Sequence, residues 1–521
     1  MSRRVLRSVL AIAVCVACAS PAAAVAIQPA PDSSAYHLEP GYRLELVAGG
    51  LTYPTSCDFD AQGRLHVLEA GFAYGPARAK ARVLRMEPDK TLVEVAGGFK
   101  GPLTGIAFIQ DSMYVADGGR PGRILRIGPD GKKTAIVDGL PTGGDHYTSQ
   151  LAAGPDGRIY FGVGSVTNSG VVGVDSFVNG WLGEDQSLHD LPTRDIALVG
   201  DDFLSADPLS KIPAKATMTG AFVPFRSTTR RGQVIKAAPV GVAAVYSVKP
   251  DGSGLALFAD GLRNPFGLAF SADSKLFCAV QGLDDRGSRP IDNDSDAMWE
   301  ITKGGWYGWP DFASGTPVTD PRFRPAGKPQ PKFVLAQHPP LAERLVARFD
   351  VHSATMQFDF SRNEAFGFAG EVFCAQFGPL TPMTGTRTGS PGRRIVRIDT
   401  RTGAVHEFLV NLKPGPDSAA PERPVCVQFD PSGRDLYIVD FGMMDAVAGA
   451  MVPVAGSGAV WRVTKATAAQ PTAQPPAATI PGGPRAGAPS GVGRGTALTA
   501  LAGGAALTGW WLWWRLYRRL K

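Results

Sequence analysis

The sequence predicts an all-β fold, a six-bladed β-propeller, from one repeated unit and from the way the chain begins. The unit is an apolar strand, a turn rich in Asp, Pro or Gly, and a second apolar strand, with two further strands after each copy. Four-stranded sheets repeated around an axis leave few unpaired edges, so the repeats predict six blades. The copies start at Cys57, Ile106, Leu151, Leu268, Phe368 and Val427.

The beginning of the propeller indicates how the ring closes. Residues Tyr42–Val47 match the outer strand that precedes each new blade, as at Leu92–Val95 and Thr134–Val137. We therefore expect residues 42–465 to form the propeller, with Tyr42–Val47 completing a last blade whose inner strands come from the C-terminal end. Before the tail, no long stretch with a helical period competes with this prediction.

The N-terminus has the pattern of a secretory signal peptide. Arg3, Arg4 and Arg7 precede an apolar run, Val9–Cys18, and small residues follow as far as Ala26. A basic start, an apolar centre and a small-residue end are the three parts of such a signal. We expect residues 1–26 to be a signal peptide and the mature protein to lie outside the cytoplasm.

The C-terminal tail predicts a membrane anchor. Residues 466–495 consist mainly of Ala, Pro, Gly, Thr and Gln, a composition typical of a flexible linker. Residues 496–514 are uncharged, end in a cluster of Trp and would span about 28 Å as a helix, which favours a transmembrane segment. An interfacial helix is the alternative. The basic residues 515–521 favour the cytoplasmic side, so we expect the propeller at the periplasmic face of the inner membrane.

Charge and cysteine content exclude several functions. The chain has 53 basic and 47 acidic side chains, a net charge of +6 without charged runs, which argues against nucleic-acid binding. No cysteine beyond the signal lies in a C-x-x-C or C-x-x-C-H motif, so neither a zinc ribbon nor a covalent c-type haem is expected. We expect buried thiols at Cys57, Cys278, Cys374 and Cys426. One disulfide among them is the alternative in an oxidising compartment.

Asp145 and His146 are candidates for proton transfer. They follow a pair of glycines and precede a hairpin with the turn Pro155-Asp156-Gly157. A His beside an Asp, held by turns on both sides, suits a general base. An ordinary capped hairpin would contain the same residues, so a structural role for His146 stays open.

A long insertion, about residues 171–242, interrupts the third blade. It is rich in Asp, Pro and Thr and has little periodicity, which predicts a surface excursion rather than a domain. Loops of this length are functional or poorly ordered. Because it follows the His146 hairpin directly, we expect it to cap one rim of the propeller.

Two further motifs lie in the fourth blade. Arg263 stands between glycines directly before a strand, so we expect its guanidinium to point into the propeller mouth, a surface arginine on a turn being the alternative. Residues 281–296 gather several Asp and two Arg, and oxygen-rich loops suit Ca²⁺, although solvated turns are their commoner use. Gly304–Pro310 adds three aromatic side chains.

Three motifs, taken together and in their order along the chain, resemble those of the glucose/sorbosone dehydrogenase family. They are Gly-Asp-His with Leu-x-x-Gly-Pro-Asp-Gly, then Gly-Leu-Arg-Asn-Pro-Phe-Gly, then Lys-Gly-Gly-Trp-Tyr-Gly-Trp-Pro, and the likeness spans residues 42–465. The insertion and the run Ser165–Gly173 resemble the sorbosone-dehydrogenase-like branch. The resemblance implies a six-bladed propeller with a site for pyrroloquinoline quinone (PQQ) and Ca²⁺ at its mouth.

The resemblance also assigns roles to single residues. His146 matches the family's catalytic base and Asp145 the acid beside it. Arg263 and Asn264 match residues that contact the quinone, and Arg423 falls where relatives place a cofactor-binding arginine. This agrees with the chemistry of PQQ, whose three carboxylates need guanidinium partners.

The same resemblance implies metal ligands. The backbone carbonyls of Gly282 and Leu283 fall where relatives hold the cofactor's calcium, and we add Asp284 and Asp296 as further metal ligands. His352, before the fifth blade, matches another family motif that lines the mouth.

Several positions depart from the family pattern. An expected Asp is Ser165 here, and one acid of a structural calcium site is Ala297. The second-blade glutamine corresponds to Lys100 or Gly101, and the lysine of blade five is not found around Gln376.

These features predict a PQQ-dependent dehydrogenase that oxidises a sugar or a related polyol or aldehyde. Since the chain has no haem motif, a membrane quinone or a separate cytochrome would accept the electrons. One alternative is a calcium-dependent lactonase-type hydrolase. The other is a non-catalytic binding propeller whose quinone site has decayed.

Overall fold

The computed structural model describes residues 30–72, 77–109, 111–381, 384, 392–447 and 450–466. The expected signal peptide (1–26), the anchor (496–514), the basic end (515–521) and nearly all of the linker lie outside these residues. Among the described residues, no helix has both the length and the apolar character needed to cross a bilayer.

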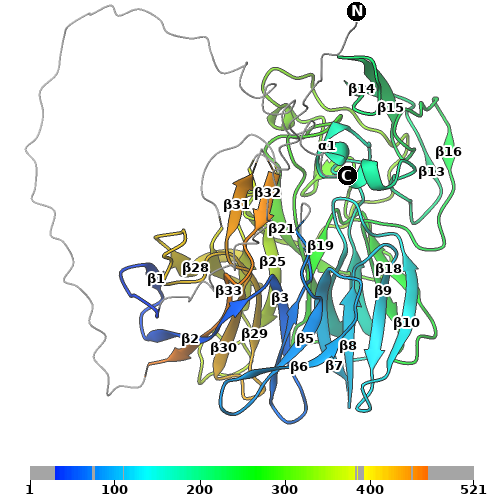
Figure 1. Cartoon of the computed structure of the whole chain (residues 1–521). Helices are drawn as coiled ribbons and strands as arrows, with labels where there is room; N and C mark the ends of the chain where they lie inside the picture. Colours follow the sequence, from blue (N-terminus) through cyan, green and yellow to red (C-terminus); the bar gives the residue numbers. More distant parts are fainter. Residues whose placement is uncertain are drawn as a thin grey trace, which may run out of the picture.

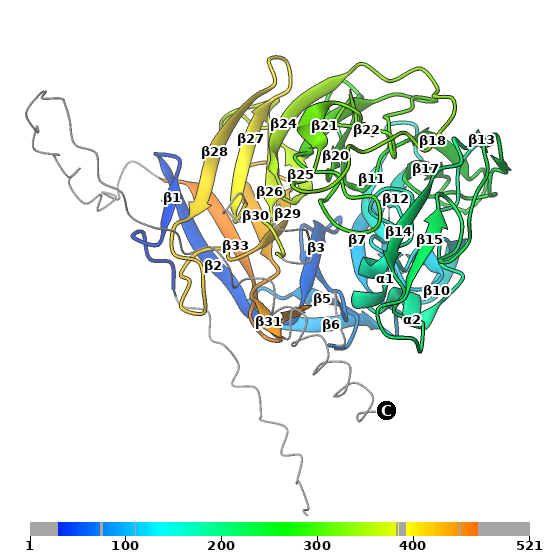
Figure 2. The same cartoon turned by 90° about the horizontal axis from the view of Figure 1, so that it is seen from above.

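Six antiparallel sheets confirm the six-bladed propeller (Figures 1 and 2). The first three blades use strands in chain order: β3 (Pro54–Phe59), β4 (Leu65–Glu69), β5 (Arg82–Met86), β6 (Leu92–Gly97); β7 (Leu103–Ile109), β8 (Ser112–Asp117), β9 (Gly122–Ile127), β10 (Lys133–Leu140); β11 (Thr148–Ala153), β12 (Ile159–Val163), β17 (Ala244–Val248), β18 (Ala256–Asp260).

Of the last three blades, the fifth and the sixth each add a strand from the beginning of the chain: β19 (Pro265–Phe270), β20 (Leu276–Val280), β21 (Ser295–Ile301), β24 (Leu345–Val351); β25 (Thr355–Phe360), β26 (Val372–Gln376), β27 (Arg394–Asp399), β28 (Ala404–Asn411), β1 (Tyr36–Leu38); β29 (Pro424–Phe429), β30 (Asp435–Asp440), β33 (Gly458–Lys465), β2 (Tyr42–Leu51). Strand β2 pairs with β33, Leu44 opposite Val463, so the ring closes between the two ends as expected. β1 adds an unexpected fifth strand to blade five.

One strand was placed wrongly by the repeat. The inner strand of blade five is β25, whereas the repeat predicted that the blade begins at Phe368. Phe368 has φ +54° and lies in the turn between β25 and β26, so it cannot continue a strand.

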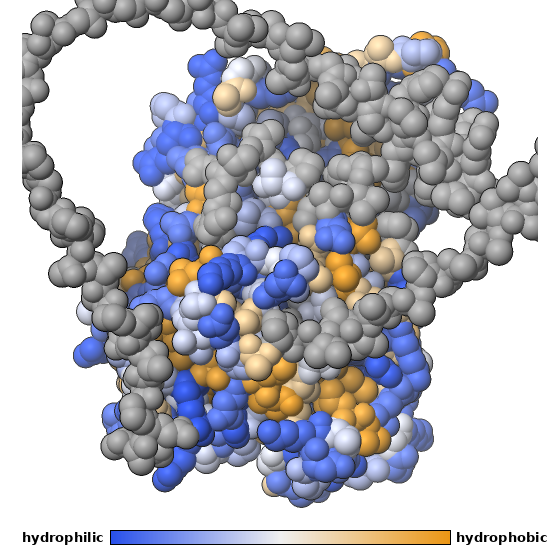
Figure 3. All heavy atoms as spheres, turned by 60° about the vertical axis from the view of Figure 1, so that its left-hand side comes forward, coloured by the Kyte–Doolittle hydropathy of each residue, from blue (hydrophilic) through white to orange (hydrophobic). Residues whose placement is uncertain are grey.

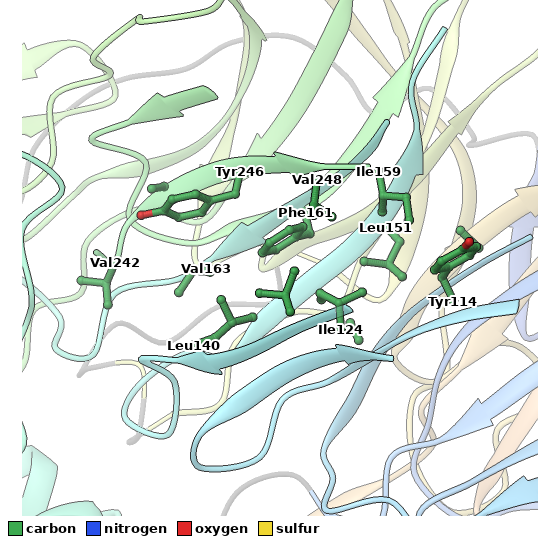
Figure 4. Packing of buried hydrophobic residues seen from close by; sticks show 14 of the residues in the cluster. Tyr114, Ile124, Leu140, Leu151, Ile159, Phe161, Val163, Val242, Tyr246 and Val248 are labelled. Carbon is green, nitrogen blue, oxygen red and sulfur yellow. The ribbon is translucent and has the colours of Figure 1, made fainter. Parts of the chain in front are cut away.

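The core of the propeller lies between neighbouring blades. Between blades two and three, Ile124 and Leu140 pack against Phe161 and Tyr246 (Figure 4). Trp181 of the insertion belongs to the same cluster, which fixes the insertion to the blades beneath it.

On the side shown in Figure 3, apolar areas lie among hydrophilic residues. All four cysteines expected to be buried are buried and unpaired: Cys57, Cys278, Cys374 and Cys426.

The inner strands form a closed ring of contacts, in the order β3, β7, β11, β19, β25, β29 and back to β3. These inner strands all begin at the same rim of the ring, and we call this rim the mouth. Since strands alternate in direction, the connection from the second to the third strand of each blade opens at the mouth as well. The insertion is one such connection. Its elements lie above the blades in Figure 1: α1 (Val174–Val178), α2 (Trp181–Glu184), β13 (Ile196–Ala197), β14 (Asp202–Ala206), β15 (Ala216–Gly220), β16 (Val234–Ile235).

The remaining short elements belong to the connections of blades four and six. They are β22 (Phe312–Ala313), β23 (Thr316–Pro317), the 3₁₀ helix η1 (Pro321–Phe323), β31 (Met444–Val447) and β32 (Ala450–Pro453).

Candidate functional site at the propeller mouth

The residues named by the sequence motifs directly precede inner strands. Asp145 and His146 precede β11, Arg263 and Asn264 precede β19, and Arg423 precedes β29. All of them are at most 5% exposed. The shared position at the start of an inner strand brings them to one rim of the ring.

His146 is held in one tautomer. Its Nδ1 lies 3.0 Å from the carbonyl oxygen of Ser165 and 3.2 Å from the Ser165 hydroxyl. The hydroxyl donates its own hydrogen to the carbonyl of Thr167, 2.7 Å away, so both contacts of Nδ1 are acceptors. Nδ1 therefore carries the hydrogen, and Nε2 keeps a free lone pair. Burial lowers the pKa of His146 to about 4, so the ring is neutral at pH 7.

Asp190 fixes the loop that holds His146. This carboxylate is fully buried and accepts hydrogen bonds from the backbone N–H of Val166, at 2.7 Å, and of Thr167, at 3.2 Å. The Val166 carbonyl in turn accepts from the N–H of Asp145, at 2.9 Å. Asp190 belongs to the insertion, so the insertion positions the candidate base. Asp190 was not predicted from the sequence, because the insertion has no periodic pattern.

Arg263 points into the mouth as expected, but four of its five N–H donors are already engaged. Its Nη2 lies 2.8 Å from Asp284 and 3.2 Å from Asp145. Its Nε donates to the carbonyl of Asn168, at 3.1 Å, and its Nη1 to the carbonyl of Gly282. Two carboxylates and two carbonyls of the chain thus surround this guanidinium.

Arg286 extends this network to the insertion. Its Nη2 contacts Asp145 at 2.5 Å and Asp284 at 2.9 Å, and its Nη1 contacts Asp175 of α1 at 2.8 Å. The contact with α1 agrees with a cap over one rim. Sequence reasoning noticed Arg286 only as one of two arginines in an oxygen-rich loop, and it missed Asp175.

The carboxylates of this network titrate differently. Burial raises the pKa of Asp145 and of Asp284, but Arg286 and Arg263 outweigh it and hold both pKa values below the usual range. Burial dominates at Asp175 and raises its pKa. One of its oxygens, Oδ1, is buried without a hydrogen-bond partner.

The predicted metal ligands are also engaged by the chain. Asp296 accepts from the N–H of Gly282 at 2.9 Å and of Thr355 at 2.6 Å, and the N–H of Leu283 donates to Asp294 at 2.7 Å. In the described part of the chain, no group of three or more His, Cys, Asp or Glu side chains is arranged to hold a metal ion.

His352 lies at the mouth beside Asp284. Its Nδ1 is 3.3 Å from the Asp284 carboxylate, and its Nε2 is buried without a partner. Burial lowers the pKa of His352, but the hydrogen bond and the charge of Asp284, together with the charges of Asp296 and Asp285, outweigh burial and raise the pKa. The residue has φ +61°, in the left-handed region that is costly for side-chain-bearing residues.

Arg423 does not join this network. Its Nη1 lies 3.2 Å from the carbonyl of Phe377 and 3.3 Å from that of Pro379, and the guanidinium stands 5.0 Å from the Phe377 ring centroid. Among the described residues, no carboxylate lies within ion-pair distance of it, and its Nε is buried without a partner. Burial, and then the neighbouring Arg393, lower the pKa of Arg423 to about 10.

The positions that depart from the family pattern take structural roles. Ser165 supplies both acceptors for His146, and the N–H of Gly101 donates to Asp117 at 2.7 Å. Gln376 is buried and accepts from Arg394 at 2.7 Å. Asn264, which matches the family pattern, donates to Gln281 at 2.8 Å.

Comparison with known proteins adds sequence similarity to one quinoprotein and a shared fold. No family model matches the chain. Over 182 residues the chain is 26% identical to quinoprotein glucose dehydrogenase B of Acinetobacter calcoaceticus, an alignment that covers 35% of this chain and 29% of that protein.

The solved structures that are similar in fold include the following two. The holo form of the pyranose dehydrogenase PQQ domain from Coprinopsis cinerea has a TM-score of 0.51 and 14% identity and covers 84% of this chain and 98% of that one. The PQQ-bound aldose sugar dehydrogenase from Streptomyces coelicolor has a TM-score of 0.45 and 17% identity, covering 82% and 100%. At these identities the first of them shows the propeller fold alone.

Proposed function

We propose that this protein is a quinoprotein-type oxidoreductase that oxidises a sugar or a related polyol or aldehyde, with His146 as the general base. The observation that carries the proposal is the fixed tautomer of His146. Ser165 holds Nδ1, so Nε2 offers its lone pair at the mouth, and the low pKa keeps it unprotonated at pH 7. The similarity to quinoprotein glucose dehydrogenase B supports the reaction class.

One residue of this mouth fits the carboxylates of PQQ. Arg423 is a buried cation without a carboxylate partner among the described residues, a costly state that a bound anion relieves. Arg423 would hold a carboxylate, while Arg263 and Asn264 would face the bound group from the blade-four side. When bound, PQQ would supply the acceptor for the hydride of the substrate carbon. His146 would take the hydroxyl proton at Nε2.

Calcium fits less well. The carbonyl of Gly282 accepts from Arg263, and Asp296 accepts from backbone N–H groups. We therefore derive no step through Ca²⁺, which stays a prediction for Gly282, Leu283, Asp284 and Asp296.

A second candidate is a binding propeller without catalysis. It is favoured by Arg263, whose Nε, Nη1 and Nη2 are already used by groups of the chain itself. These contacts use four of the five N–H groups of the guanidinium, so only one, on Nη1, is left for a cofactor unless the network rearranges.

Titration of the full chain with PQQ, with and without Ca²⁺, tests the proposal. We expect binding tighter than about 10 µM, weakened at least about tenfold in Arg423→Met and unchanged in the exposed control Arg401→Met. His146→Asn should still bind PQQ but fail to reduce a dye in the presence of sugars. Absence of binding at tens of micromolar would overturn the dehydrogenase, and tight binding without turnover would favour the binding propeller. A lactonase would instead hydrolyse sugar lactones without PQQ.

The proposal extends to partners and location. A membrane quinone or a separate cytochrome would take the electrons, and the signal peptide and anchor predicted from the sequence would hold the propeller at the periplasmic face of the inner membrane.

A further inference from the structure

A cavity of about 380 Å³ lies beside the mouth, between the insertion and the loops of blade four. We call it the side cavity. Residues 192–197 of the insertion form one wall and residues 335–339 another, and Trp306, Trp309 and Phe222 also line it. Its volume falls in the range of small-molecule sites in proteins. None of the residues assigned to proton transfer or cofactor contact lines it.

The walls of the side cavity are fixed by the backbone. Trp306 forms β-bridges with Asp260 and with Leu341, and Leu198 forms one with Leu335. The buried Asp311 accepts from the N–H of Leu335 at 2.9 Å. Because the walls are already held in place, little conformational entropy of the protein is lost when a ligand binds.

The charged side chains of the side cavity are already paired. Arg194 makes two hydrogen bonds with Asp260, at 2.5 and 2.9 Å. Asp195 pairs with Lys236 at 2.7 Å, and the ring of His338 contacts Asp311 at 3.0 Å. A charged ligand would have to compete with these pairs, so the lining favours a neutral ligand.

Polar and aromatic groups nevertheless face the side cavity. Gln337 is exposed, and its amide makes no hydrogen bond to another described residue. The His338 ring stacks on Trp306, with ring centroids 5.7 Å apart and planes at 24°. An amide that both donates and accepts, next to flat rings, suits a molecule with many hydroxyls and apolar C–H faces.

We propose that the side cavity binds a neutral polyhydroxylated molecule of monosaccharide size, at a site separate from the mouth. The two sites share one acceptor. The carbonyl of Asn168 accepts from Trp309 Nε1 at 3.2 Å, in the cavity wall, and from Arg263 Nε at 3.1 Å, in the mouth. A ligand that shifts Trp309 therefore acts on the position of Arg263. This inference does not rest on the proposed oxidoreductase activity.

Saturation-transfer NMR with D-glucose, on the full chain without PQQ or an electron acceptor, tests the proposal. We expect transfer from the protein to the sugar in the wild type. Gln337→Ala should weaken binding about 3- to 10-fold through the lost amide hydrogen bonds. Gln337→Trp should abolish it, because the larger side chain takes up part of the cavity that Gln337 lines. Gln186→Ala is the matched control, since Gln186 is exposed on the insertion, which forms the opposite wall, but does not line the cavity.

The outcomes separate the side cavity from the mouth. Binding that persists in His146→Asn and is lost in Gln337→Trp, with unchanged melting temperatures, supports the proposal. Binding that is unaffected by Gln337→Trp, or lost in His146→Asn, places the sugar at the mouth and overturns it. Tighter binding of D-glucuronate than of D-glucose overturns the neutral character of the site, and absence of transfer from the wild type overturns the site itself.

Discussion

Arg263 and Arg286, on the side of the mouth formed by blades three and four, are surrounded by carboxylates. Among the described residues, the guanidinium of Arg423 at blade six instead contacts two carbonyls and an aromatic ring. Arg286 alone contacts Asp145, Asp175 and Asp284. Among the described residues, no carboxylate is within ion-pair distance of Arg423. The three side chains are all buried or nearly so, so burial does not explain the difference.

This contrast suggests that the two sides of the mouth have different roles. On the side of blades three and four the charges balance one another and fix the position of His146 and the insertion. On the side of blade six, Arg423 makes no ion pair with the described residues, and the nearby charges of Glu422 and Asp440 do not offset its burial, which is the arrangement expected where an anionic group binds. We therefore expect a substitution on the side of blades three and four to lower the stability, and one at blade six to leave it unchanged or raise it.

The largest effect is expected for Arg286→Met. The substitution leaves three buried carboxylates with one arginine among them, and breaking a buried ion pair costs about 3–5 kcal/mol. Urea unfolding of the full chain measures it, with Arg401→Met, whose side chain is 86% exposed, as the control that stays close to the wild type. A loss below about 1 kcal/mol would show that the network contributes little and would remove the contrast.

The second-largest effect is expected from the protonation of His146, which makes the stability depend on pH. Its pKa is about 4 in the folded protein and about 6.5 when unfolded, so the unfolded state binds the proton first as the pH falls. The free energy of unfolding should therefore drop by about 3 kcal/mol between pH 6.5 and pH 4 through this group alone. The same loss should be missing in His146→Asn. Equal slopes for the two proteins across this window would contradict a buried neutral ring.

The same comparison shows what the sequence could predict. Repeats of alternating apolar strands identified six blades and the closure by β2, because each strand has its own local signal. Blade five was misplaced because Phe368 is apolar but lies in a turn, with φ +54°. Asp145, His146 and Arg263 were found because motifs place them directly before inner strands.

Asp175 and Asp190 were missed for a physical reason. Both belong to an insertion without a periodic pattern, and their roles arise only when the insertion folds back over the mouth. Likewise, the sequence places Arg263 and Arg423 at the mouth, but it does not show that Arg263 forms ion pairs with carboxylates and Arg423 does not. Pairing of buried charges depends on tertiary contacts between distant loops, which no local pattern records.

The smallest effect on stability, and the most informative one, is expected for Arg423→Met. Methionine has a similar length and carries no charge, so the substitution removes the desolvation cost of an unpaired guanidinium while the aliphatic packing stays. The lost contacts to the carbonyls of Phe377 and Pro379 offset part of this gain. We expect the free energy of unfolding of the apo protein to be unchanged or to rise by about 1 kcal/mol, although PQQ binding falls. A loss of about 3 kcal/mol or more would mean that Arg423 stabilises the fold in the way Arg286 does. The two sides of the mouth would then be alike, and the argument for an anion at blade six would fail.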